Sequence, residues 1–185
     1  MVMTELAPSA LVATITDLRR EWFDTHVPWH RISSVVDITD DAGELIDDVL
    51  DDNRALRATV IDVAGTDAHA RLRLAHHGSQ VRVQAGGSFH DLPAAADYYL
   101  LPDGVEDIDR TRLCRLFAAV AAAASMRSRA LCCLPSGEAA RLIELAESSG
   151  LEITRMGSGA ADPDAFSAAV LVEFGLAAPK LLPID

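Results

Sequence analysis

The stretch at residues 109–156, DRTRLCRLFAAVAAAASMRSRALCCLPSGEAARLIELAESSGLEITRM, carries the strongest structural pattern in the chain. Its first part places apolar residues at helical spacing behind a capping residue, Asp109. The short apolar run at 129–134 then predicts a buried strand, which Pro135 ends. A second helix follows, and after it a strand at 151–156. The predicted order is helix, strand, helix, strand.

This order contains a strand-helix-strand unit. Two strands joined by one helix lie parallel, and the crossover is right-handed in nearly all known cases. Ser136 can cap the second helix, and Gly150 supplies the left-handed residue that commonly ends one. Strand alternation turns Cys132 and Cys133 to opposite faces of the sheet. The inner stripe of the second helix consists of apolar residues at helical spacing: Ala139, Leu142, Ile143 and Ala146.

Three earlier runs, at 56–63, 69–75 and 80–85, alternate apolar and polar residues. Such alternation is typical of half-buried strands, and the intervening turn residues predict an antiparallel meander. The solvent-exposed face of this meander would carry Arg71, Arg73 and Arg82. Pairing of these side chains with carboxylates is favoured over binding of an anionic ligand. A fourth strand is predicted at 98–101, and 167–174 is a strand or, alternatively, a helix that begins at Asp162 and Pro163.

The predicted fold class is α+β, with a mixed sheet that combines the antiparallel meander, the C-terminal βαβ unit and flanking helices. At 185 residues the chain fits a single domain at 1–185, which would bury roughly 70% of its unfolded surface. The segments 1–8 and 176–185 are expected to be loosely packed tails. An N-terminal helix is predicted around Leu11, Ile15, Leu18 and Trp22.

Composition excludes several classes of function. The net charge of −12 disfavours nucleic acid as a partner, because phosphate neutralisation requires clustered positive charge. No apolar run approaches the roughly 18 residues that would suggest a membrane span, and the N-terminus lacks the pattern of a secretory signal. Three cysteines form no disulfide framework and suit a reducing compartment. A cytoplasmic protein is expected.

The strongest charge feature is an acidic segment at 37–52. Apolar residues recur within it at helical spacing, so the carboxylates occupy the outer face of an amphipathic helix. This face is either simply solvated or a docking surface for a basic protein partner. The candidate docking residues are Asp40, Asp41, Glu44, Asp47, Asp48, Asp51 and Asp52.

A candidate ligand site follows from the βαβ unit, because ligands bind beyond the carboxyl ends of parallel strands. Two loops of small residues would share that edge, and the amides that begin the second helix suit an anionic ligand. The pattern matches no dinucleotide or Walker motif, so plain helix capping and chain reversal remain the alternative. The candidate ligand-binding residues are Cys133, Ser136, Gly137, Gly157, Ser158 and Gly159.

Thiol and imidazole chemistry is weakly indicated. Cys133 precedes a helix, where a thiol pKa can fall, but a nucleophile would need a base from the distant histidines. His26 and His30 flank Pro28, which argues against a helical metal pair. His76 and His77 could converge with His90 on a metal, although solvated turn histidines are the default. No metal and no cofactor is therefore predicted.

These patterns contain no convergent catalytic motif. The sequence alone favours an acidic accessory or protein-interaction protein, with a homodimer as one option for its assembly, and it does not decide whether the protein is an enzyme. The alternative is an enzyme or binder of a small anionic molecule that uses the loops at 133–137 and 157–159.

Overall fold

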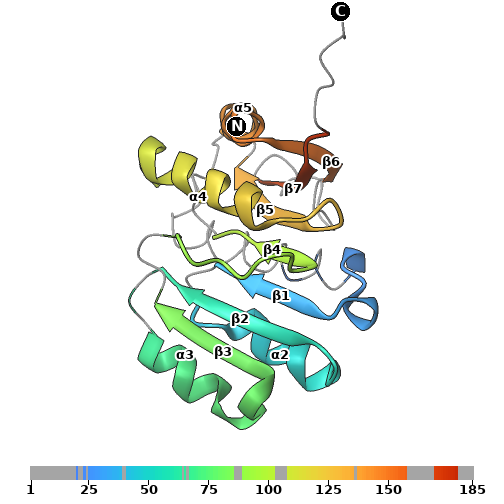
Figure 1. The fold of residues 1–185 in the computed structure, drawn as a ribbon, viewed down its shortest axis with the longest axis vertical. Coiled ribbons are helices and arrows are strands. Elements are labelled where there is room, and N and C mark those ends of the chain that lie inside the picture. The colour runs from blue at the N-terminus through green and yellow to red at the C-terminus, as the bar shows by residue number, and fades with distance from the viewer. Residues whose placement is uncertain are drawn as a thin grey trace, which may run out of the picture.

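The computed structural model shows a layered α/β fold in which one twisted sheet separates two groups of helices (Figure 1). Described residues are 20, 23, 25–38, 41–63, 65, 67–85, 89–102, 108–135, 137–157 and 169–178. The strands are β1 (Ser34–Asp37), β2 (Arg57–Asp62), β3 (Val81–Ala85), β4 (Tyr98–Leu100), β5 (Arg129–Pro135), β6 (Leu151–Gly157) and β7 (Ala169–Leu176). The helices are α2 (Glu44–Asp52), α3 (Asp67–Arg73), α4 (Arg110–Ala123) and α5 (Ala139–Ser148), with 3-10 turns η1 (Trp29–Arg31) and η2 (Leu74–Gln80).

The described strands form a seven-stranded sheet in the order β3-β2-β1-β4-β5-β7-β6. Strands β3, β2, β1, β4 and β5 are parallel, whereas β7 is antiparallel to both of its neighbours, β5 and β6. The predicted mixed sheet with flanking helices is confirmed. Because the sheet is mostly parallel and covered by helices, its arrangement is that of an α/β protein, and the predicted α+β class is corrected in this respect.

The helices and strands predicted for 109–156 are confirmed, but the predicted cap of the second helix at Ser136 is wrong, because the N-cap residue of α5 is Glu138, which makes no side-chain capping hydrogen bond. Asp109 caps α4 by accepting a hydrogen bond from the amide of Arg112 at 3.0 Å. Strand β5, helix α5 and strand β6 follow, and β5 and β6 run in the same direction. They are not neighbours, however, because β7 is inserted between them. The segment left open between strand and helix at 167–174 is thus a strand in its described part.

The antiparallel meander is wrong. Strands β2 and β3 exist, but they pair in parallel, and the predicted strand between them is helix α3 with the start of η2. Ala70 and Leu74 are both buried and lie four residues apart, which is a helical spacing. Leu72, the apolar residue between them, is 79% exposed. The apparent alternation therefore combined one helical stripe with one solvent-facing leucine.

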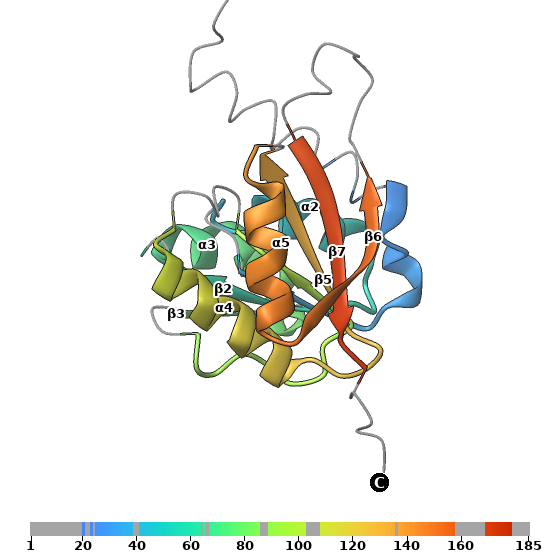
Figure 2. The same cartoon turned by 90° about the horizontal axis from the view of Figure 1, so that it is seen from above.

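Two apolar cores lie on the two faces of the sheet. Figure 2 shows α4 and α5 over one face and α2 behind the other. Successive strand residues divide between these cores: Val36, Tyr99 and Cys132 belong to the α4/α5 core, and Val35, Tyr98 and Cys133 to the α2 core. The opposite orientation of Cys132 and Cys133 is thereby confirmed.

Several predictions fall partly outside the described residues. The N-terminal helix is represented only by Arg20, Phe23, Thr25 and His26, and both predicted tails lie outside except for 176–178. His26 and His30 are both exposed around the buried Trp29. None of the helices in the described part of the chain has the length and apolar character needed to cross a membrane.

Candidate functional site

The sheet has a topological switch point between β1 and β4. From β1 the chain proceeds outward to β2 and β3, and from β4 it proceeds outward in the other direction. Figure 1 shows that β1, β2 and β3 point the same way, so their carboxyl ends lie at one edge of the sheet. In open parallel sheets, ligands bind outside this edge at the switch point.

Two buried carboxylates end the strands on one side of the switch point. Asp37 is the last residue of β1 and is fully buried, and Asp62 is the last residue of β2 and is 7% exposed. Asp37 pairs with Val60, so Asp62 lies two residues farther along the neighbouring strand. Ionisable side chains are rarely buried without a specific role, because desolvation disfavours the charged form. The pair therefore marks the edge as a candidate site.

A tight turn joins β1 to α2 at the same edge. Ala42 and Gly43 both have a left-handed backbone, with φ of 54° and 77°. Asp41 accepts hydrogen bonds from the amides of Gly43 at 2.8 Å and Leu45 at 3.4 Å. The carboxylate of Asp41 thus already accepts hydrogen bonds from the N-cap residue and the first turn of α2. A phosphate bound at the start of a helix would need these same amides.

Phe89 and Arg112 lie beside the carboxyl end of β2. The Arg112 guanidinium carbon is 5.7 Å from the centre of the Phe89 ring, and its Nη2 atom donates to the carbonyl of Val63 at 3.5 Å. Because Val63 directly follows Asp62, the first turn of α4 is tied to the strand end that carries the second carboxylate. An aromatic side chain and a cation consequently border this part of the edge.

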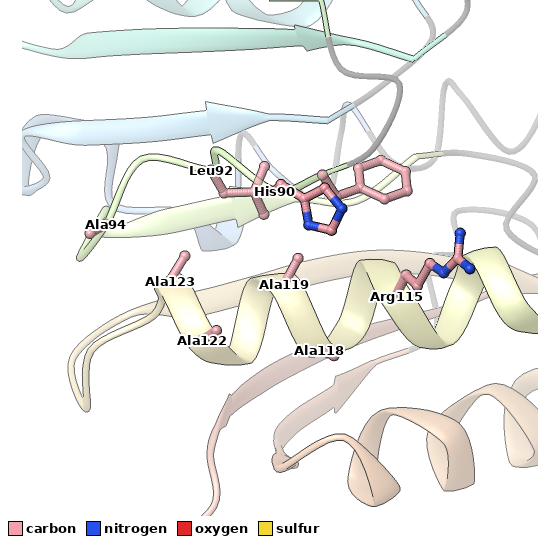
Figure 3. Close-up of a pocket in the computed structure, with 9 residues that line it drawn as sticks. His90, Leu92, Ala94, Arg115, Ala118, Ala119, Ala122 and Ala123 are labelled. Atoms are coloured by element: carbon pink, nitrogen blue, oxygen red, sulfur yellow. The ribbon is translucent and has the colours of Figure 1, made fainter.

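A groove of about 480 Å³ runs along α4 from Phe89. Figure 3 shows Ala119 and Ala123 pointing from α4 toward His90 and Leu92, which belong to the connection between β3 and β4. The groove is wide because the side chains on this face of α4 are small. His90 lies here and is not part of the histidine pair at η2, so the three imidazoles do not converge.

The predicted ligand-binding residues are distributed along the same edge. Pro135 at the end of β5 and Gly157 at the end of β6 pair with β7 from opposite sides, so β7 separates the two loops. Cys133 is buried in the α2 core, and Gly137 is an exposed turn residue at which an added Cβ would meet nothing within 4 Å. Ser136, Ser158 and Gly159 lie outside the described residues. An anionic ligand at these loops stays a prediction.

The predicted docking face of α2 carries many intramolecular contacts. Arg20 pairs with Asp48 and Glu44, and Arg73 pairs with Glu44 at 3.4 Å. His76 and His77 both face Asp47. The surface pairing predicted for Arg73 is confirmed. Asp51 and Asp52 are exposed, and Asp40 lies outside the described residues.

The sequence analysis missed Asp37 and Asp62. A signal was present, because each carboxylate directly ends an apolar strand, in SVVD and in ATVID. Asp37 was instead counted with the acidic segment at 37–52, and Asp62 lay in a strand predicted to pair antiparallel, so the two residues were not brought together. A parallel arrangement of these strands is needed to see the pair.

Comparisons with known proteins find similarity in structure alone. No protein-family model matches the chain, and no curated protein is significantly similar in sequence. Among solved structures, mitomycin 7-O-methyltransferase MmcR matches with a TM-score of 0.72 and 22% identity over 89% of this chain and 54% of its own.

Two further methyltransferases match comparably. The O-methyltransferase NcsB1 from neocarzinostatin biosynthesis, determined with S-adenosylmethionine and a naphthoic acid, has a TM-score of 0.68 and 22% identity, covering 91% of this chain and 58% of its own. The dimethyltransferase RosA from Streptomyces davawensis has a TM-score of 0.69 and 18% identity over 90% and 56%.

The chain spans just over half the length of these structures. Their agreement with it over about nine-tenths of its length contradicts the predicted non-catalytic accessory protein and the basic protein partner, and favours the small-molecule alternative. The chain has the fold of small-molecule methyltransferases.

Proposed function

We propose that the protein is a small-molecule methyltransferase that binds S-adenosylmethionine at the carboxyl ends of β1 and β2. The observation that carries the proposal is the buried pair Asp37 and Asp62 beside the switch point of a methyltransferase fold. When bound, S-adenosylmethionine supplies an electrophilic methyl group on a sulfonium ion. The similarity to solved structures concerns the fold, and the proposal adds a cofactor and an activity to it.

The two carboxylates suit the chemistry of this cofactor. A carboxylate at the end of the second parallel strand accepts hydrogen bonds from the hydroxyl groups of a nucleoside ribose in analogous α/β folds, and Asp62 occupies that position. The cofactor also carries an ammonium group and a sulfonium group. Negative charge at Asp37 and along the turn into α2 stabilises such a cation, since opposite charges attract most strongly where water is excluded.

The turn between β1 and α2 disfavours phosphate-containing cofactors. Asp41 already accepts hydrogen bonds from the first amides of α2, and a phosphate brought there would meet its carboxylate. S-adenosylmethionine contains a nucleoside but no phosphate, so it avoids this repulsion. The same turn therefore argues against a dinucleotide or a nucleoside triphosphate as the ligand.

Calorimetric titration of the full chain with S-adenosylmethionine and S-adenosylhomocysteine tests the proposal. Asp62→Asn should weaken binding by at least about tenfold, corresponding to about 1.4 kcal/mol, because a neutral amide accepts hydroxyl hydrogen bonds less strongly. Asp52→Asn makes the same chemical change at an exposed position of α2 and should leave the affinity unchanged.

Adenosine monophosphate provides the ligand control. It shares the nucleoside but adds a phosphate, and it should bind more weakly than S-adenosylhomocysteine. Transfer of a labelled methyl group to a panel of hydroxylated aromatic acceptors then tests the activity. Absence of binding at millimolar S-adenosylhomocysteine, or equal affinity in the wild type and in a folded Asp62→Asn variant, would contradict the proposed site.

A further inference from the structure

A second cluster of ionisable side chains lies on the other side of the sheet from α4, where α2 contacts η2. His76 and His77 are adjacent in η2, and Gly78, with φ of 57°, turns the chain immediately after them. Both imidazoles face Asp47 in the first half of α2, and Asp51 follows one helical turn later on the same face. The cluster belongs to a different part of the molecule from the edge that carries Asp37 and Asp62.

The distances within this cluster are compatible with a metal site, although the shortest of them, between Asp47 and His77, is also that of a hydrogen bond. Asp47 Oδ1 is 2.8 Å from His77 Nε2 and 3.4 Å from His76 Nε2, and Asp51 Oδ1 is 3.7 Å from His76 Nε2. Ligands bound tetrahedrally to zinc at about 2.0–2.1 Å lie about 3.3 Å from one another. The observed separations bracket this value, so a metal ion fits among these atoms with small adjustments of side chains.

The orientation of His76 supports the same conclusion. Its Nδ1 atom lies 3.0 Å from the carbonyl oxygen of Arg73, which can only accept, so Nδ1 carries the hydrogen. In the neutral ring, the lone pair is then on Nε2 and faces the carboxylates of Asp47 and Asp51. This arrangement is favourable when a metal ion lies between the lone pair and the carboxylates, or when Nε2 is protonated and donates to them. A backbone carbonyl bound to the second ring nitrogen is the usual support of a metal-binding histidine.

Burial and space distinguish this cluster from an ordinary surface ion pair. The His77 side chain is only 5% exposed, and its ring lies against that of His76 with 3.9 Å between ring centres. A polar hollow of about 170 Å³ adjoins the two imidazoles. It provides room for water to complete the coordination of an ion. Arg54 and Gln80 also line it, and the positive charge of Arg54 lowers the affinity for a cation.

We propose that Asp47, His76 and His77 bind a divalent transition metal ion of the zinc class, with water completing the coordination and Asp51 adding negative charge beside His76. Two imidazole nitrogens with carboxylate oxygens suit zinc, whereas calcium and magnesium prefer oxygen ligands alone. The ion would connect α2 to η2. This proposal is independent of the proposed methyltransferase function.

Titration of the metal-free full chain with Zn²⁺ by calorimetry tests the proposal, with Co²⁺ as a spectroscopic probe of tetrahedral coordination. We expect one ion per chain and a rise in melting temperature on addition of Zn²⁺. His77→Ala and Asp47→Asn should each weaken binding by at least about tenfold. His90→Ala removes an exposed imidazole beside α4 and should retain the wild-type affinity.

His76→Ala is a second variant that should stay folded, because the His76 side chain is 55% exposed and its removal leaves the core intact. A folded His76→Ala variant should also lose at least about tenfold in Zn²⁺ affinity. The proposal is overturned by absence of binding at millimolar Zn²⁺, or by affinity that His90→Ala reduces as much as His76→Ala does. It is equally overturned if His76 only gains a proton, seen by NMR as an imidazolium that Zn²⁺ does not perturb.

Discussion

The two edges of the parallel sheet use carboxylates in different ways. At the amino-terminal edge, Asp97 precedes β4 and accepts hydrogen bonds from the backbone amides and hydroxyl groups of Ser33 and Ser34, at 2.7–3.3 Å. At the carboxyl-terminal edge, Asp37 and Asp62 are buried at the ends of β1 and β2. One carboxyl group joins the beginnings of two strands, whereas the other two lie at the edge where parallel sheets bind ligands.

The amino-terminal edge is a continuous network of backbone contacts. The amide of Arg129 donates to the carbonyl of Asp97 at 2.9 Å, and the amide of Arg57 donates to the carbonyl of Ser33 at 2.9 Å. The buried hydroxyl of Ser128 donates to the carbonyl of Ala96 at 2.6 Å. These contacts connect the beginnings of β1, β2, β4 and β5. At the amino-terminal edge polar groups thus join the strands, whereas the carboxyl-terminal edge carries the candidate site.

Gly43→Ala is the substitution at the carboxyl-terminal edge with the largest expected effect on stability. Gly43 has φ of +77°, and an added Cβ would lie 2.7 Å from Cδ1 of the buried Leu74. Backbone strain and displacement of Leu74 together should lower the free energy of unfolding by about 2–4 kcal/mol. Urea titration monitored by circular dichroism measures this change.

Gly65→Ala is a matched control for that experiment. Gly65 has the same φ of +77°, but nothing lies within 4 Å of an added Cβ. Its substitution should therefore cost only the backbone term, about 1–2 kcal/mol. Equal losses in the two variants would show that the contact between Gly43 and Leu74 does not constrain the turn from β1 into α2.

Asp97→Ala should weaken the amino-terminal edge and leave ligand binding intact. The substitution removes the shared acceptor of Ser33 and Ser34, and we expect a loss of about 1–2 kcal/mol in the free energy of unfolding near pH 7. The affinity for S-adenosylhomocysteine should not change. A variant of unchanged stability but weakened binding would reverse the roles assigned to the two edges.

The contribution of Asp97 should depend on pH in a defined direction. Burial raises the pKa of Asp97, but hydrogen bonds from Ser33 and Ser34 outweigh it and hold the pKa below its ordinary value. A lowered pKa in the folded state stabilises the protein above the unfolded pKa, and this stabilisation is lost as pH falls through the folded pKa. The difference in unfolding free energy between wild type and Asp97→Ala should therefore shrink below about pH 4. A difference that stays constant from pH 7 to pH 3 would contradict this assignment.

Local sequence patterns predicted those elements in which the spacing of apolar residues and the residues at the ends both indicate the same type of structure. Helix α4 was recognised because Asp109 caps a regular apolar stripe, and α2 because its buried and charged residues separate cleanly. Helix α3 was mistaken for a strand because Leu72 is apolar but exposed. The position of β7 between β5 and β6 depends on pairing between residues distant in sequence, which no local pattern encodes.

The candidate site was harder to predict, because it depends on strand direction. The described ends of β5 and β6 lie at the same edge as those of β1 and β2, but the switch point lies between β1 and β4, away from the βαβ unit. Asp37 was grouped with the acidic helix, and Asp62 was one polar residue among several in an alternating run. Only the parallel pairing of β1 with β2 shows that both residues end strands at one edge.

Mapping amide chemical shifts on addition of S-adenosylhomocysteine is the decisive test of a ligand site at the carboxyl ends of β1 and β2. We expect the largest changes at these strand ends and in the turn into α2, at Ile38, Asp41, Gly43 and Val63. Amides of Ser33, Ser34 and Ser128 at the opposite edge should not shift. Changes confined to that opposite edge or to Gly137 and Gly157, or no change at millimolar ligand, would contradict this expectation.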